Sequence, residues 1–246
     1  MNRSRFFSLL AAVAALATTP LALACESCAA YNKDNDFQIK ETTGRYDATL
    51  DSIVLEITVG GKAGHTQPKP AGKLDGAPVL GYVFPTTLKS TDIGFSATEG
   101  IVALALTSHP DFDDSPIWDE NGDGIYDNDG LVWHPHWVVL TKDDRVPGGL
   151  AVKEFKKGDA SVKLPPTAPG MPMFMDSPGF PVLTRDKVIR VVLPASRVNN
   201  RTDFKFDAVA CYMQVNTTDM MMPMLGVMRV YSVASGDLSL PYALKQ

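Results

Sequence analysis

The sequence predicts an all-β protein, a two-sheet antiparallel sandwich with long loops rich in proline and glycine. Several short segments alternate apolar and polar residues with the two-residue period of a strand. The chain has 18 prolines and 19 glycines among 246 residues, and the loops between these segments are rich in both. After residue 24, apolar residues nowhere keep a 3.6-residue spacing for three turns, so helices should be few and short. A sandwich of immunoglobulin-like or jelly-roll-like type is favoured over an up-and-down barrel, whose turns are usually tighter and more regular.

Residues 1–24 carry the features of a secretory signal peptide. Arg3 and Arg5 precede an apolar run from 6 to 17, and Ala22-Leu23-Ala24 forms an A-x-A cleavage site. The mature chain is then expected to begin at Cys25, in the periplasm or outside the cell. The twin-arginine pair of the folded-export signal is absent, which favours the general export route. The apolar run is too short for a permanent transmembrane anchor, and no later segment qualifies.

The rest of the chain divides into a lead-in and one domain. Residues 25–44 are polar and charged, which predicts a mobile lead-in containing a C-x-x-C pair, and residues 45–246 predict a single β-sandwich domain. The first strand is expected at 53–59, where Ile53, Leu55 and Ile57 alternate with more polar residues. A loop over 60–78 follows and contains His65. Further strands are expected at 79–84, 101–107, 131–140, 150–155, 188–193, 204–215 and 225–233.

The three cysteines, Cys25, Cys28 and Cys211, form an odd number in what should be an oxidising compartment. Two arrangements account for them. If Cys25 carries a lipid anchor after cleavage, Cys28 and Cys211 remain to form a disulfide. If Cys25 and Cys28 pair, as a disulfide or as ligands of a soft metal, Cys211 is a lone thiol.

The charge distribution argues against nucleic acid as a partner. Without Arg3 and Arg5 the chain has 21 basic and 28 acidic residues, a net charge of −7. Ten of the acidic residues, and no lysine or arginine, lie between Ser90 and Thr141, which leaves the rest of the mature chain at about +3. Such a block is explained either as a solvated acidic loop or as carboxylates neutralised by a bound cation.

A candidate calcium loop lies in this acidic block. Its ligands occupy positions 1, 3, 5 and 9, with Gly124 at position 6 for the sharp turn. These ligands are Asp119, Asn121, Asp123 and Asp127. The segment 119–129 resembles the calcium loops of dockerin and thrombospondin type-3 repeats, which implies calcium binding by those residues. Position 12 is Gly130 in place of an acidic residue, which departs from these repeats, and Asp129 or the Asp111-Asp113-Asp114 cluster would have to substitute for the missing ligand.

A second candidate site follows, on the strand expected at 131–140. Alternation puts His134 and His136 on one face of this strand and the two tryptophans on the other. Two imidazoles at i and i+2 can reach one transition-metal ion, and His109 or His65 would be a third ligand. Pro135 has no amide hydrogen, which indicates a sheet edge or a bulge where a ligand can approach. Structural packing of the two rings explains the pattern equally well.

Clustered methionines indicate a soft-metal site. After the initiator, all nine methionines lie between Met171 and Met228, and two runs occupy proline-containing, turn-like sequence. Thioether sulfur selects Cu(I) and persists in an oxidising compartment, so copper is the leading soft metal. The candidate sulfur ligands are Met220, Met221, Met222, Met224, Cys211 and Met213. Core filling and a pliable surface that binds a partner protein are the alternatives.

The leading hypothesis is an exported, non-enzymatic metal-binding protein that takes part in metal handling or resistance. Calcium would bind at 119–129, and copper at the histidines or the sulfur residues. The alternative is a calcium-stabilised module that binds a protein or glycan surface, and a zinc-dependent enzyme is the third hypothesis. Enzyme function is disfavoured because the chain lacks a Gly-x-Ser-x-Gly elbow, a glycine-rich phosphate loop and an H-E-x-x-H helix.

Overall fold

The computed structural model describes residues 25–32, 34–69, 73–110 and 132–246. Over these ranges the protein is all-β with antiparallel sheets and almost no helix, as the sequence predicts. The described helices are short: α1 (Glu26–Ala29) and the 3-10 turns η1 (Ser90–Ile93) and η3 (Ala195–Val198). None of them has the length and apolar character needed to cross a membrane. The predicted signal peptide and the candidate calcium loop at 119–129 lie outside the described residues.

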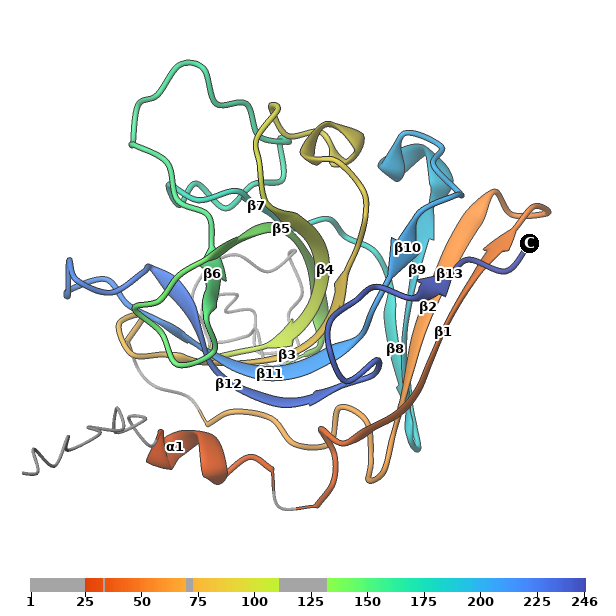
Figure 1. Cartoon of the computed structure of the whole chain (residues 1–246), viewed down its shortest axis with the longest axis horizontal. Coiled ribbons are helices and arrows are strands. Elements are labelled where there is room, and N and C mark those ends of the chain that lie inside the picture. The colour runs from red at the N-terminus through yellow and green to blue at the C-terminus, as the bar shows by residue number, and fades with distance from the viewer. Residues whose placement is uncertain (1–24, 33, 70–72, 111–131) are drawn as a thin grey trace, which may run out of the picture.

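The largest sheet closes into a six-stranded barrel, which Figure 1 shows end-on. The strands follow the order β4-β3-β11-β12-β6-β5, and pairing of β5 with β4 completes the ring. They are β3 (Pro78–Pro85), β4 (Ile101–Ser108), β5 (His134–Lys142), β6 (Leu150–Val152), β11 (Val209–Val215) and β12 (Leu225–Val233). A short strand, β7 (Met175–Asp176), also pairs with β5. The expected two-sheet sandwich is therefore not confirmed, because this sheet curls until β4 and β5 hydrogen-bond to each other.

A separate four-stranded sheet lies beside the barrel, at the right of Figure 1. Its order is β1-β2-β9-β8, and its strands are β1 (Ile39–Asp47), β2 (Ser52–Val59), β8 (Val182–Arg185) and β9 (Val188–Pro194). A two-stranded ladder joins β10 (Lys205–Phe206) to β13 (Tyr242–Ala243). Strand β1 begins within the segment 25–44 that the sequence predicts as a lead-in, and it pairs with β2 over its length.

The main core fills the layer between the four-stranded sheet and the barrel. Ile53, Leu55 and Ile57 of β2 are fully buried there, in one cluster with outward-facing barrel residues such as Tyr82 and Leu104. Burying an aliphatic side chain of this size contributes roughly 1.5–3 kcal/mol. The two-residue alternation therefore divides the side chains of each barrel strand between two clusters. One face packs in the main core, and the opposite face lines the barrel interior.

The same alternation occurs along strand β5, which carries His134 and His136. Trp137 belongs to the outer core, whereas Val138 and Leu140 belong to the interior cluster. Pro135 pairs with β4, and β7 borders the other side of β5 only from Trp137 onward. Among the described residues, the start of β5 is therefore bordered by one strand alone, as the proline predicts. The side chain of His136 faces the barrel interior.

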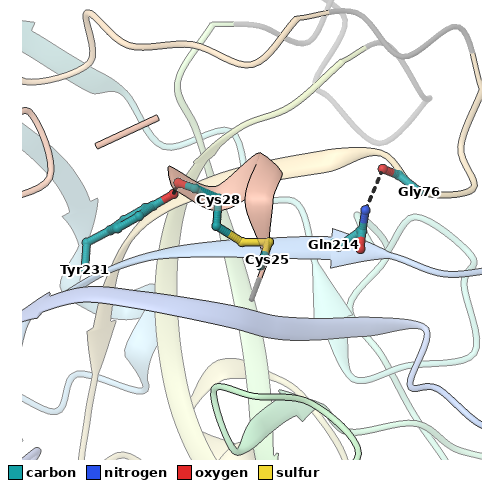
Figure 2. The surroundings of a disulfide bond; sticks show 5 residues. All are labelled: Cys25, Cys28, Gly76, Gln214 and Tyr231. Carbon is teal, nitrogen blue, oxygen red and sulfur yellow. Dashed lines mark hydrogen bonds between the residues drawn. A yellow bond between two sulfur atoms is a disulfide. The ribbon is translucent and has the colours of Figure 1, made fainter. Parts of the chain in front are cut away.

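The N-terminal C-x-x-C pair forms a disulfide between Cys25 and Cys28, shown in Figure 2. The Cys28 side chain is fully buried, and the hydroxyl of Tyr231 on β12 donates a hydrogen bond of 2.7 Å to the Cys28 carbonyl oxygen. Cys211 on β11 is left as a buried free thiol. The structure thus shows the second of the two cysteine arrangements that the sequence allows.

Candidate metal centre

Three histidines from neighbouring strands meet at one end of the barrel interior. His109 follows the last residue of β4, and His134 and His136 lie at the start of β5. Thr107 pairs with His134 across the two strands, which brings the residues after β4 beside the start of β5. The exposed fractions of His109, His134 and His136 are 2%, 5% and 3%. One nitrogen from each ring lies within 4.8 Å of the other two.

Two of the rings are oriented by backbone carbonyl groups. Nδ1 of His134 lies 2.7 Å from the carbonyl oxygen of Val132, and Nδ1 of His109 lies 3.1 Å from that of Pro110. A carbonyl oxygen can only accept a hydrogen bond, so both Nδ1 atoms must carry the hydrogen and donate it. In each neutral ring the lone pair then lies on Nε2, which is the atom left to bind a metal.

These two Nε2 atoms, of His109 and His134, are 2.8 Å apart. Two lone pairs at that separation repel each other, and the repulsion is strong in a buried site of low dielectric constant. The hydroxyl of Thr107 lies 3.4 Å from Nε2 of His134 and has one hydrogen to donate. The contact becomes favourable when a cation lies between the rings, either a shared proton or a metal ion.

A metal ion would satisfy more of this arrangement than a proton, because His136 could also bind it. Bonds of about 2.0–2.1 Å from zinc place two tetrahedral nitrogen ligands about 3.3 Å apart, so small movements of the rings complete the shell. Neutral imidazoles suit Zn(II) and Cu(II), whereas calcium prefers oxygen ligands. Three protein ligands leave one coordination position for water or another molecule, as in catalytic zinc sites.

A serine after β7 orients the third histidine. Oγ of Ser177 lies 3.0 Å from Nδ1 of His136. The preceding residue, Asp176, is fully buried, and its Oδ1 accepts a hydrogen bond of 2.6 Å from the hydroxyl of Thr167. Burial raises the pKa of the Asp176 carboxyl group above its ordinary value. Ser177 could not be identified from the sequence, because the proline-rich segment around it shows no strand period. Only the pairing of β7 with β5 brings Ser177 to His136.

Two of the predicted sulfur ligands lie in the barrel interior. Cys211 and Met213 line the same cavity as His109 and His136. Burial raises the pKa of the Cys211 thiol to about 12, so this thiol stays protonated at neutral pH. As a thiol it is a weak ligand, because the thiolate is the form that binds metals.

The other predicted sulfur ligands lie on the loop between β11 and β12. Met220 and Met221 are 91% and 75% exposed. Met222 lines a different hollow from the one that the histidines line. Met224 is half-buried against the interior cluster. The structure therefore separates the exposed methionine run from the histidine cluster.

The remaining candidate ligands lie elsewhere. His65 has a side chain that is 65% exposed, and its Nδ1 lies 3.4 Å from a carboxylate oxygen of Asp36. Of the two histidines that the sequence offers as a third ligand, the structure places His109 and not His65 beside the pair on β5. The calcium candidates all lie outside the described residues: Asp119, Asn121, Asp123, Asp127 and Asp129.

Comparison with known proteins adds nothing to this geometry. No protein-family model, no curated protein and no solved structure matches the chain.

Proposed function

We propose that this chain is an exported metal-binding protein in which His109, His134 and His136 bind one divalent transition-metal ion, copper or zinc. The observation that carries the proposal is the 2.8 Å approach of the His109 and His134 Nε2 atoms, in rings whose Nδ1 atoms both face carbonyl oxygens. A metal ion between the rings turns this repulsive contact into a bonded one. Export rests on the signal-peptide features of residues 1–24, and the role proposed for the bound metal is metal handling or resistance.

The cavity beside the histidines supports copper over zinc. Four sulfur-containing side chains line it together with His109 and His136: Met171, Met175, Cys211 and Met213. Imidazole nitrogen suits Cu(II), and thioether sulfur suits Cu(I). A cavity that offers both kinds of donor suits copper, because copper changes between these two oxidation states. Zinc stays Zn(II) and has no need of both.

Metal titration of the mature, disulfide-bonded protein tests the proposal. Competition against a chromophoric chelator should show one Cu(II) or Zn(II) bound per chain. Replacing both His134 and His136 with Ala removes two ligands, so the affinity should fall by more than the ~10–100-fold expected for loss of an outer-shell partner. His65→Ala is the matched control and should bind as the parent does, because His65 contacts Asp36 and not the cluster. A double variant that binds both metals with parental affinity would exclude this site.

Cu(I) binding by the exposed methionines is tested separately. Leu keeps the volume and apolar character of Met, so replacing Met220, Met221, Met222 and Met224 with Leu should change stability by less than about 1.5 kcal/mol per site. If these residues hold Cu(I), the variant loses Cu(I) affinity and keeps Cu(II) affinity. Unchanged Cu(I) affinity would assign these side chains to packing or to a partner surface.

A zinc-dependent enzyme is the second candidate function. The observation in its favour is that the three buried histidines lie beside an apolar cavity. Three protein ligands would leave zinc one coordination position for water or a substrate atom. Zinc in protein purified from its native compartment, without copper, would favour this function over metal handling.

The exposed methionines support a third candidate, a calcium-stabilised module that binds a protein or glycan surface. Met220 and Met221 present flexible apolar side chains to solvent next to each other on one loop. Such side chains adapt to many partner surfaces. Calcium as the sole metal in the native protein would favour this function.

A further inference from the structure

The interior of the barrel contains a cavity of about 100 Å³. Thr107, His109 and His136 line it at the end where β4 finishes and β5 begins. Pro85 and Val209 line it as well, and both pair near the opposite end of the barrel. The cavity therefore extends along the barrel from the histidine cluster.

Small side chains on three adjacent strands create this space. Thr107 of β4 pairs with Gly81 of β3, which in turn pairs with Cys211 of β11, so these residues form one row across the barrel wall. A Cβ atom at Gly81 would lie 2.9 Å from Cε of Met213, which shows that this methionine lies over the glycine. Ala105, two residues before Thr107, also lines the cavity. Small barrels are usually filled by their own side chains, and here these small residues leave part of the interior open.

The wall of the cavity is almost entirely aliphatic or thioether. Among the described residues that line it, the ionisable ones are His109, His136 and Cys211, and there is no lysine, arginine or carboxylate. Burial raises the pKa of the Cys211 thiol to about 12, so that group is neutral at physiological pH. A charged ligand would meet no opposite charge among the described residues of this wall and would lose its hydration on entry.

We propose that this cavity binds a small, uncharged, mainly apolar molecule that has at most one polar group, directed at Thr107 and His136. A cavity of ~150 Å³ takes benzene, so this one of about 100 Å³ suits a molecule of about four to six heavy atoms. Met171, Met175 and Met213 in the wall have flexible side chains that adjust to the shape of the ligand. The apolar character of the ligand does not depend on the proposed metal, because the aliphatic wall is the same with or without an ion.

Binding of 1-butanol and of n-butylammonium to the mature protein tests the proposal, since the two probes have equal numbers of heavy atoms and differ in charge. Methyl resonances of methionine are followed by NMR during each titration, first with EDTA and then with zinc. We expect saturable shifts of the Met213 methyl with 1-butanol and at least tenfold weaker binding of n-butylammonium. A cavity-filling variant, Val209→Phe, should weaken 1-butanol binding at least tenfold. Val188→Phe, on the four-stranded sheet, is the matched control and should leave it unchanged.

The results of these titrations test the cavity proposal separately from the metal proposal. Absence of saturable shifts, equal binding of the two probes, or full binding by a folded Val209→Phe protein would overturn the proposal. If Val209→Phe does not fold, a nuclear Overhauser contact between butanol protons and the Met213 methyl in the unaltered chain decides the matter, and its absence at saturation would overturn the proposal. Butanol binding by a protein that binds neither Zn(II) nor Cu(II) in the metal titration would refute the metal proposal and leave this one standing.

Discussion

At the scale of single residues, the hydroxyl of Ser177 is the group that orients His136. Outer-shell partners of a histidine ligand typically contribute 10–100-fold to metal affinity. Ser177→Ala should therefore weaken Cu(II) or Zn(II) binding by about that factor while the urea unfolding midpoint stays close to the parental one. Ser161→Ala is the matched control, because Ser161 is exposed and its hydroxyl contacts Asp159. Equal metal affinities of the two variants would show that Ser177 does not position the ligand.

The thiol of Cys211 gives a second test at this scale. With a pKa of about 12, the thiolate makes up about one part in ten thousand at pH 8. The side chain is also 2% exposed. Iodoacetamide should leave Cys211 unmodified in the native protein and alkylate it fully in 6 M guanidinium, as measured by mass spectrometry. Rapid alkylation under native conditions would mean that the barrel opens; no alkylation after unfolding would mean that Cys211 is disulfide-bonded.

The sequence predicted part of the histidine cluster, because two of its members are placed by local backbone geometry. His134 and His136 share a face because strand alternation is a property of the backbone alone. The third ligand depends on which strand pairs with β5, and residues 107 and 134 are brought together only by that long-range register. For this reason the sequence left His109 and His65 as equal candidates, and it gave no sign of Ser177.

At the scale of secondary-structure elements, Gly100 is the residue that lets β4 start against β5. Its φ is +141°, and a Cβ atom there would lie 2.5 Å from Cγ1 of Val139 and 2.6 Å from the carbonyl oxygen of Leu140. Gly100→Ala should therefore lower the free energy of unfolding by about 2 kcal/mol or more, measured by urea denaturation. Gly179→Ala, where a Cβ atom meets nothing within 4 Å, should stay within about 0.5 kcal/mol of the parent. Similar losses in both variants would contradict this account.

Most strands were predictable as elements because their alternation is intrinsic to the sequence. The segments expected at 53–59, 79–84, 101–107, 188–193 and 225–233 correspond to β2, β3, β4, β9 and β12. The strand expected at 204–215 is two strands, β10 and β11. They are separated at the buried Asp207, whose carboxylate accepts hydrogen bonds from Ala208 and Ser235. Strands β1, β7, β8 and β13 were missed. Strand β1 is polar and shows no apolar period, and the other three are short and depend on pairing with β5, β9 and β10.

At the scale of the whole molecule, closure of the barrel could not be predicted from the sequence. A strand with one face on a core and the other face in a second apolar layer has the same alternation in a sandwich and in a closed barrel. What distinguishes them here is the pairing of β4 with β5, which adds a second apolar interior beside the main core. The same pairing assembles the histidine cluster, so the fold and the candidate site have one cause.

Calcium at 119–129 and zinc at the histidine cluster should stabilise the chain independently, since their candidate ligands are different residues. Segment 111–131 connects His109 at the end of β4 to His134 at the start of β5, and it contains the calcium candidates. A ligand that binds only the native state stabilises it by RT ln(1 + [L]/Kd), about 2.7 kcal/mol at a hundredfold excess over Kd. Calcium and zinc should therefore each raise the melting temperature, and their effects should add when both are present.

Two double variants assign these increments, as measured by calorimetry with EDTA, calcium or zinc. Replacing Asp119 and Asp123 with Ala should remove the calcium increment and keep the zinc increment, because carboxylate oxygens suit calcium. Replacing His134 and His136 with Ala should do the reverse, because imidazole nitrogens suit zinc. If the aspartate variant responds to calcium as the parent does, the loop at 119–129 is not a calcium site. If that variant loses the zinc increment instead, the acidic segment contributes ligands to the histidine centre, and the two sites are one.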